Sequence, residues 1–150
     1  MAWRVTGGQL KVLFCLLVFA VFEPGVASEH IDDNGMPPGV AIVEAEDVIR
    51  LAQQSRDLII IDSRTSVDRE IGYIEESVSL SDNQTNCKTL SKISKRLDRP
   101  LVFYCNGIKC ARSQRAVRQA SLCGYSKLYW FKGGYEEWRE KHLPVLGPVR

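Results

Sequence analysis

Short runs of apolar residues alternate along the chain with stretches in which apolar positions recur at helical spacing. The runs predict strands and the spaced positions predict amphipathic helices. The run at 58–61, Leu-Ile-Ile-Ile, is continuous and rich in β-branched residues, which indicates a strand buried on both faces and hence a parallel sheet. The expected strands are 40–43, 58–61, 77–80, 101–104 and 127–131, and the expected helices are 44–54, 87–97, 111–122 and 135–141.

These elements predict one α/β domain over residues 38–146, with a mostly parallel central sheet flanked by helices. In the helix at 87–97, Leu90 and Leu97 are expected on the same buried face. Residues 68–74 are expected to form a short acidic turn, and residues 147–150 a C-terminal tail.

The N-terminal region departs from this alternation. Arg4 and Lys11 precede an uninterrupted apolar run at 12–22, and the small residues Gly25-Val26-Ala27 follow a Glu-Pro-Gly break. A basic start, an apolar centre and small residues at a cleavage site are typical of a secretory signal peptide. We therefore expect a signal peptide over 1–27, cut after Ala27 or one residue later.

Export to the periplasm or to the outside of the cell is the expected localisation. The apolar run is about half the length of ~20 residues that a membrane-spanning helix needs, although an uncleaved anchor stays an alternative. No contact with the membrane is expected once the signal is removed. Residues 28–37 are rich in polar residues, glycine and proline, and are expected to be a flexible lead-in.

Composition and charge indicate a globular protein and argue against one class of partner. The chain is 45% hydrophobic and 25% charged, as is ordinary for a globular protein. Its 20 Lys and Arg side chains nearly balance 18 Asp and Glu, for a net charge of +2, and no block of like charge is present. Nucleic acid is therefore not expected as a partner.

Candidate chemistry centres on Cys105, which directly follows the apolar run at 101–104. Where a strand ends and a helix is about to begin, backbone N–H groups point at the side chain with the positive end of the helix dipole behind them. Such a place favours the nucleophilic thiolate, and Lys109 and Arg112 add positive charge. A buried structural cysteine is the alternative, but Gly107 and the basic residues favour the reactive one.

The cysteines beyond the predicted signal allow three full pairings, which an oxidising compartment would permit. Cys87 is expected to be an ordinary helix residue, and Cys123 a core residue before the helix-stopping Gly124. The spacing of Cys105 and Cys110 is not a metal signature, because no second pair exists and the histidines lie far away. Neither a metal nor another cofactor is expected.

Asp62 and Arg64 follow the strand at 58–61. Ligands of such sheets bind beyond the carboxyl ends of the strands, so both side chains could lie near the Cys105 loop. Structural support through hydrogen bonds between neighbouring loops is the favoured interpretation.

Two further motifs are Gly72-Tyr73-Ile74 and Gly133-Gly134-Tyr135-Glu136-Glu137-Trp138. Together with the Asp62–Arg64 and Cys105 motifs they resemble the rhodanese (thiosulfate sulfurtransferase) family over roughly residues 38–146. The strand, cysteine, loop and helix start are similar to the active-site half of that domain. The loop 106–112 is two residues longer than is usual there, and Tyr73 replaces a histidine. The matching motifs are Cys105 to Arg112-Ser113, Gly133-Gly134-Tyr135-Glu136-Glu137-Trp138, Ile61-Asp62-Ser63-Arg64 and Gly72-Tyr73-Ile74.

The resemblance implies a rhodanese-like three-layer fold and a sulfurtransferase that carries a sulfane sulfur as a persulfide on Cys105. The donor would be a small anion such as thiosulfate, the acceptor a thiol or a cyanide-like group, and no cofactor would be needed. The loop would hold the anion, and three further residues would support the site. The loop residues are Asn106, Gly107, Ile108, Lys109, Cys110, Ala111 and Arg112, and the supporting residues are Asp62, Arg64 and Ser113.

Two other functions stay open: an exported thiol–disulfide protein that uses Cys105 and Cys110, and a non-catalytic rhodanese-like binding module. A phosphatase-like anion cradle is less compatible, because six residues separate Cys105 from Arg112 where five are usual. We also predict a reversible disulfide between Cys105 and Cys110 that switches sulfur transfer off. The alternative places Cys110 in the core, away from Cys105.

Overall fold

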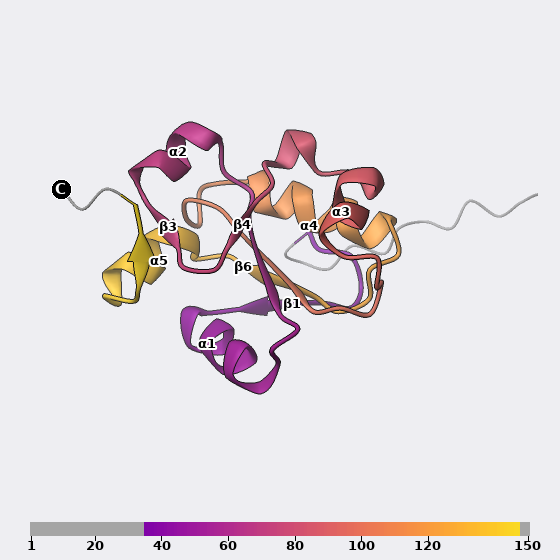
Figure 1. Ribbon diagram of the computed structural model, residues 1–150, viewed down its shortest axis with the longest axis horizontal. Coiled ribbons are helices and arrows are strands. Elements are labelled where there is room, and N and C mark those ends of the chain that lie inside the picture. Colours follow the sequence, from indigo (N-terminus) through magenta and orange to yellow (C-terminus); the bar gives the residue numbers. More distant parts are fainter. Residues whose placement is uncertain (1–34, 148–150) are drawn as a thin grey trace, which may run out of the picture.

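A five-stranded sheet forms the centre of the computed structural model, which describes residues 35–147 (Figure 1). The strands lie in the order β1-β6-β5-β2-β4, and every neighbouring pair is parallel. Their bounds are β1 Val40–Val43, β2 Ile59–Asp62, β4 Val78–Ser79, β5 Leu101–Tyr104 and β6 Leu128–Phe131.

Helices cover both faces of this sheet. On one face lie α3 (Cys87–Ile93) and α4 (Arg112–Leu122), and on the other lie α1 (Ala45–Gln54) and α5 (Gly134–Glu140) (Figure 1). The remaining elements are α2 (Ser66–Ile71), the 3-10 helix η1 (Asp82–Gln84) and a small antiparallel sheet of β3 (Tyr73–Ile74) with β7 (Val145–Leu146). The predicted α/β fold, with a parallel sheet between helix layers, is confirmed.

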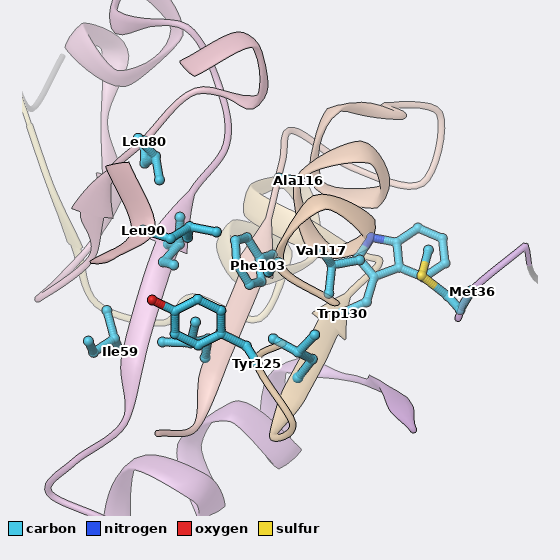
Figure 2. Packing of buried hydrophobic residues seen from close by; sticks show 13 residues of the cluster. Met36, Ile59, Leu80, Leu90, Phe103, Ala116, Val117, Tyr125 and Trp130 are labelled. Atoms are coloured by element: carbon cyan, nitrogen blue, oxygen red, sulfur yellow. The ribbon is translucent and has the colours of Figure 1, made fainter. Parts of the chain in front are cut away.

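Two apolar cores lie one on each face of the sheet, and they explain why the sequences of β2 and β5 contain uninterrupted runs of apolar residues. Successive side chains of a strand point to opposite faces, so each run supplies both cores. Phe103 lies in the core under α3 and α4, which Figure 2 shows, whereas its neighbours Val102 and Tyr104 lie in the core under α1 and α5. All four residues of β5 are buried. Burial on both faces holds this strand, and the residue that follows it, in place.

The end of the predicted lead-in is anchored to the domain. Met36 is fully buried in the core beside Trp130 (Figure 2), and the Arg118 side chain donates hydrogen bonds to the carbonyl oxygen of Gly35. The end of the segment predicted as a lead-in thus packs against the domain through one apolar side chain and one backbone carbonyl. The predicted signal peptide at 1–27, the lead-in at 28–34 and residues 148–150 of the predicted tail lie outside the described residues.

Other boundaries differ locally from the prediction. Helix α2 (Ser66–Ile71) includes the first part of the segment expected as an acidic turn. Its first turn is capped by Thr65 Oγ1, which accepts a hydrogen bond from Asp68 N at 3.2 Å. Helix α3 ends at Ile93, so Leu97 is half exposed rather than on its buried face. At the C-cap residue Ser94 the backbone becomes extended, and its carbonyl oxygen accepts a hydrogen bond from the Tyr125 hydroxyl, a partner distant in sequence.

A disulfide joins Cys87, the first residue of α3, to Cys123, the last before Gly124, with their Cα atoms 5.3 Å apart. The prediction that Cys87 is an ordinary helix residue is wrong. Gly124 has a φ of +88° and ends α4, as predicted. The bridge spans 36 residues, a separation for which loop closure contributes roughly 3–4 kcal/mol to stability. Between residues 35 and 147, no helix is long and apolar enough to cross a membrane.

Candidate active site

Strand β5 delivers Cys105 to the carboxyl edge of the sheet, where the residue is 1% exposed. The loop that follows turns back on itself: Cys110 N donates a hydrogen bond to Gly107 O at 2.9 Å. This turn brings Cys110 to Cys105, and the structure joins the two in a disulfide with their Cα atoms 6.1 Å apart. The expectation that the Cys110 sulfur reaches Cys105 is confirmed, and the alternative with Cys110 in the core is wrong. Whether the bridge switches activity stays a prediction.

The start of α5 holds the other half of the loop. Tyr135 N donates to Cys105 O at 2.9 Å, and Glu136 N donates to Asn106 O at 2.7 Å. Gly134 adopts a φ of +60°, and a Cβ at this position would collide with the carbonyl oxygen of Cys105. The second glycine of the Gly-Gly pair therefore permits a close backbone approach that fixes the cysteine.

A surface pocket of about 390 Å³ lies against this loop. It is lined by Asn106, Gly107, Ile108, Lys109 and Cys110 from the loop and by Glu136 from α5. The sequence analysis included Glu136 in a motif but did not predict that it lines the pocket. In the structure its carboxylate lies so close to Gly107 that a Cβ there would collide with it.

Arg112 is tied to α2. Its Nη1 donates to Asp68 Oδ2 at 2.9 Å, and Asn106 Nδ2 lies 3.4 Å from Asp68 Oδ1. Burial raises the pKa of Asp68, but hydrogen bonds from Thr65 and Asn106 lower it. The charge of Arg112 also lowers it, and the resulting pKa is below the usual value. Arg112 thus shares its charge with a carboxylate, whereas Lys109 lies exposed on the pocket.

Asp62 and Arg64 form a buried ion pair, with exposed fractions of 1% and 2%. Arg64 Nε and Nη2 donate to the two carboxylate oxygens of Asp62 at 2.9 and 2.7 Å, and Nη2 also donates to Gly72 O at 2.8 Å. Arg69 and the Tyr104 hydroxyl donate to Asp62 Oδ2 at 3.0 and 2.6 Å. These bonds tie β2, α2 and β5 together beside the cysteine loop, the supporting role that the sequence favoured.

The same network shifts the pKa values of Tyr104 and Arg64. Burial and the negative charge of Asp62 raise the pKa of Tyr104 well above its usual value, so its hydroxyl stays a donor. Burial lowers the pKa of Arg64, but the hydrogen bonds and charge of Asp62 outweigh this effect and raise it. The Arg64 guanidinium also lies 4.3 Å from the ring centre of Tyr135, at the start of α5.

Two further positions act away from the pocket. Ser113 is buried, and its Oγ accepts a hydrogen bond from Trp130 Nε1 at 3.0 Å, which fastens α4 to β6. Tyr73, which stands where the resemblance has a histidine, lies 3.7 Å from the Arg69 guanidinium carbon. Among the described residues no group of His, Cys, Asp and Glu is arranged to hold a metal ion.

The structure is therefore an α/β domain with a cysteine loop at the carboxyl edge of its parallel sheet, between strand β5 and helix α4. Among such domains, the rhodanese-like domain family matches residues 44–141, and the chain belongs to this family. The chain is also similar to a sulfurtransferase of Allochromatium vinosum, with 26% identity over 106 residues that cover 71% of this chain and 94% of that protein.

Solved structures share the fold. The BH2092 protein from Bacillus halodurans has a TM-score of 0.64 and 23% identity, and the match covers 71% of this chain and 77% of that one. The polysulfide-sulfur transferase homodimer from Wolinella succinogenes has a TM-score of 0.59 and 22% identity, with 75% of this chain and 82% of that one covered. At these identities the similarity concerns the fold.

Proposed function

We propose that this protein is a sulfurtransferase that carries a sulfane sulfur as a persulfide on Cys105. The observation that best supports this proposal is the position of Cys105. The residue directly follows strand β5, which is buried on both faces, and it directly precedes the loop residues that line the pocket. The sulfurtransferase name of the Allochromatium vinosum relative and membership of the family support the same reaction.

The chemistry needs only the cysteine and its loop. The Cys105 thiolate attacks the outer sulfur of thiosulfate, the S–S bond breaks, and sulfite leaves with the bonding electron pair. An acceptor thiolate or cyanide then takes the outer sulfur from the persulfide, and Cys105 leaves again as the thiolate. Backbone N–H groups of the loop and the charge of Lys109 would stabilise the negative sulfur and attract the anionic donor.

The disulfide in the structure favours a second candidate, a thiol–disulfide oxidoreductase that uses Cys105 and Cys110. In that reaction the bridge passes to the thiols of a partner and no sulfur is gained. Sulfur transfer requires the opposite starting state, because Cys105 can attack a donor only as a free thiolate.

The Cys110→Ser variant separates the two candidates, because it cannot form the bridge. After reduction and incubation with thiosulfate, the peptide that contains Cys105 is expected to gain one sulfur atom by mass spectrometry. Cyanide should then remove this sulfur as thiocyanate. If no sulfur is gained from thiosulfate or from inorganic polysulfide, the sulfurtransferase proposal is wrong. Oxidation of a dithiol by the bridged wild type alone would then support the oxidoreductase.

We also propose that the domain works after export, in the periplasm or outside the cell. The predicted signal peptide at 1–27 supports this localisation, as does the Cys87–Cys123 disulfide, because structural disulfides form and persist in oxidising compartments and are rare in the cytosol. N-terminal sequencing of the protein from its native host should begin at Ser28 or Glu29. A cytosolic protein that begins at Met1 would contradict export, and a membrane-bound one would point to an uncleaved anchor.

A further inference from the structure

We infer that Cys110 resolves the Cys105 persulfide, so that the protein releases the carried sulfur as sulfide and is left with the Cys105–Cys110 disulfide. This adds a reductive activity to the same site and rests on the proposed function for its first step. It also assigns a partner class, a dithiol that opens the bridge again.

The arrangement of the loop supports different roles for the two cysteines. The carbonyl oxygens of Cys105 and Asn106 are fixed by backbone N–H groups of α5, at 2.9 and 2.7 Å. Beyond Gly107 the loop is exposed at Ile108 and Lys109, and Cys110 is partly exposed. Cys105 is thus the fixed, buried sulfur, and Cys110 the sulfur that the outer part of the loop carries to it.

The resolving step is balanced within the protein. The Cys110 thiolate attacks Sγ of the Cys105 persulfide, and a new bond forms between the two cysteine sulfurs. The bond from Cys105 Sγ to the sulfane sulfur breaks, and the sulfane sulfur leaves as HS⁻ with the bonding electron pair and the persulfide proton. The two cysteines are oxidised by two electrons, and the sulfane sulfur is reduced to sulfide.

The observed bond supports attack on the inner sulfur of the persulfide, Cys105 Sγ. Attack on the inner sulfur ends with Cys105 and Cys110 bonded to each other, which is the arrangement in the structure. Attack on the outer sulfur would instead move the persulfide to Cys110 and leave Cys105 as a thiolate. Only the first reaction releases sulfide and needs a reductant before the next turnover.

The different exposure of the two cysteines indicates which sulfur the reducing dithiol attacks. In the bridged form an external dithiol can approach Cys110, which is partly exposed, but not Cys105, which is 1% exposed. Its thiolate attacks Cys110 Sγ, the Cys105–Cys110 bond breaks, and Cys105 leaves as the thiolate with the bonding electron pair. The second thiol of the partner then attacks the mixed disulfide and frees Cys110. The partner becomes a disulfide, and the protein regains both thiols.

A single-turnover experiment tests this inference. The wild type and the Cys110→Ser and Cys110→Ala variants are reduced, freed of reductant and mixed without oxygen with one equivalent of thiosulfate. The wild type is expected to release one sulfide per chain while the peptides of Cys105 and Cys110 together lose two hydrogen atoms. Both variants are expected to keep the added sulfur on Cys105 and to release no sulfide. Peptide mapping reads this pair separately from Cys87 and Cys123.

The alternatives are distinguishable. A wild type that keeps the sulfur on Cys105 and releases no sulfide would overturn resolution by Cys110 and leave the proposed function standing. Sulfur found on Cys110 would overturn it in favour of a relay between the two cysteines. If neither Cys110 variant gains sulfur from thiosulfate or from inorganic polysulfide, the proposed function fails, and the inference falls with it.

Discussion

Replacing Cys105 by serine is expected to reduce the transfer of sulfur from thiosulfate to cyanide by at least about a thousandfold, because the residue that would form the covalent intermediate is lost. A serine hydroxyl does not take up a sulfane sulfur. The substitution changes one side-chain atom directly after β5. It also removes the Cys105–Cys110 bridge, but this bridge joins residues only 5 positions apart and closes a short loop, so the fold should persist. Thiocyanate formation measures the rate, and far-ultraviolet circular dichroism measures the fold.

A matched control removes the other cysteine pair. The double variant Cys87→Ser with Cys123→Ser loses a bridge that lies between α3 and the end of α4. It should keep sulfur transfer at temperatures where it is folded, and its free energy of unfolding should fall by roughly 3–4 kcal/mol. If Cys105→Ser retained full activity, another group would have to carry the sulfur, and the proposed role of Cys105 would be wrong.

Replacing Asp62 by alanine is expected to lower the free energy of unfolding by about 3–5 kcal/mol. Asp62 is 1% exposed and accepts hydrogen bonds from Arg64, Arg69 and the Tyr104 hydroxyl. Its removal leaves the buried Arg64 guanidinium without its counter-charge, and the desolvation cost of that charge is no longer offset. Urea unfolding, followed by circular dichroism, measures the change.

Asp57→Ala is the matched control, because Asp57 also pairs with an arginine, Arg96, at 2.7 Å but is 55% exposed. Solvent screens that pair, so its loss should cost about 0–1 kcal/mol. Equal destabilisation by the two substitutions would show that the Asp62 network does not hold the domain together. The cysteine loop also depends on Asp62 indirectly, since Tyr104 immediately precedes Cys105.

The sequence predicted most elements of the fold because a buried strand or helix face requires apolar residues at neighbouring or regularly spaced positions. All four residues of β2 and of β5 are buried, and both strands are apolar except for the last residue of β2, Asp62, and the hydroxyl of the last residue of β5, Tyr104. Cys105 and its loop were found for the same reason: a short buried strand followed by a glycine-containing loop and a helix is a pattern of neighbouring residues. The Asp62–Arg64 pair is likewise local, two residues apart.

The tertiary structure decided which distant groups meet. Arg112 lies 44 residues from Asp68, and nothing near either residue in the sequence indicates that they pair. Cys87 and Cys123 are 36 residues apart, and composition allowed three pairings without choosing one. Met36 lies in a polar segment, but the space it fills lies beside a strand much later in the chain.

The site shows the same division. The sequence determined that Cys105 ends a buried strand beside basic residues, because those features depend on neighbours within a few positions. It left two places open for Cys110 and did not assign Glu136 to the pocket. Only the folded chain places α5 on the loop and turns Cys110 back onto Cys105. Long-range packing fixes α5 on the loop, and residue spacing along the chain carries no record of it, whereas the contact between Cys105 and Cys110 depends on a local turn whose direction the spacing alone did not decide.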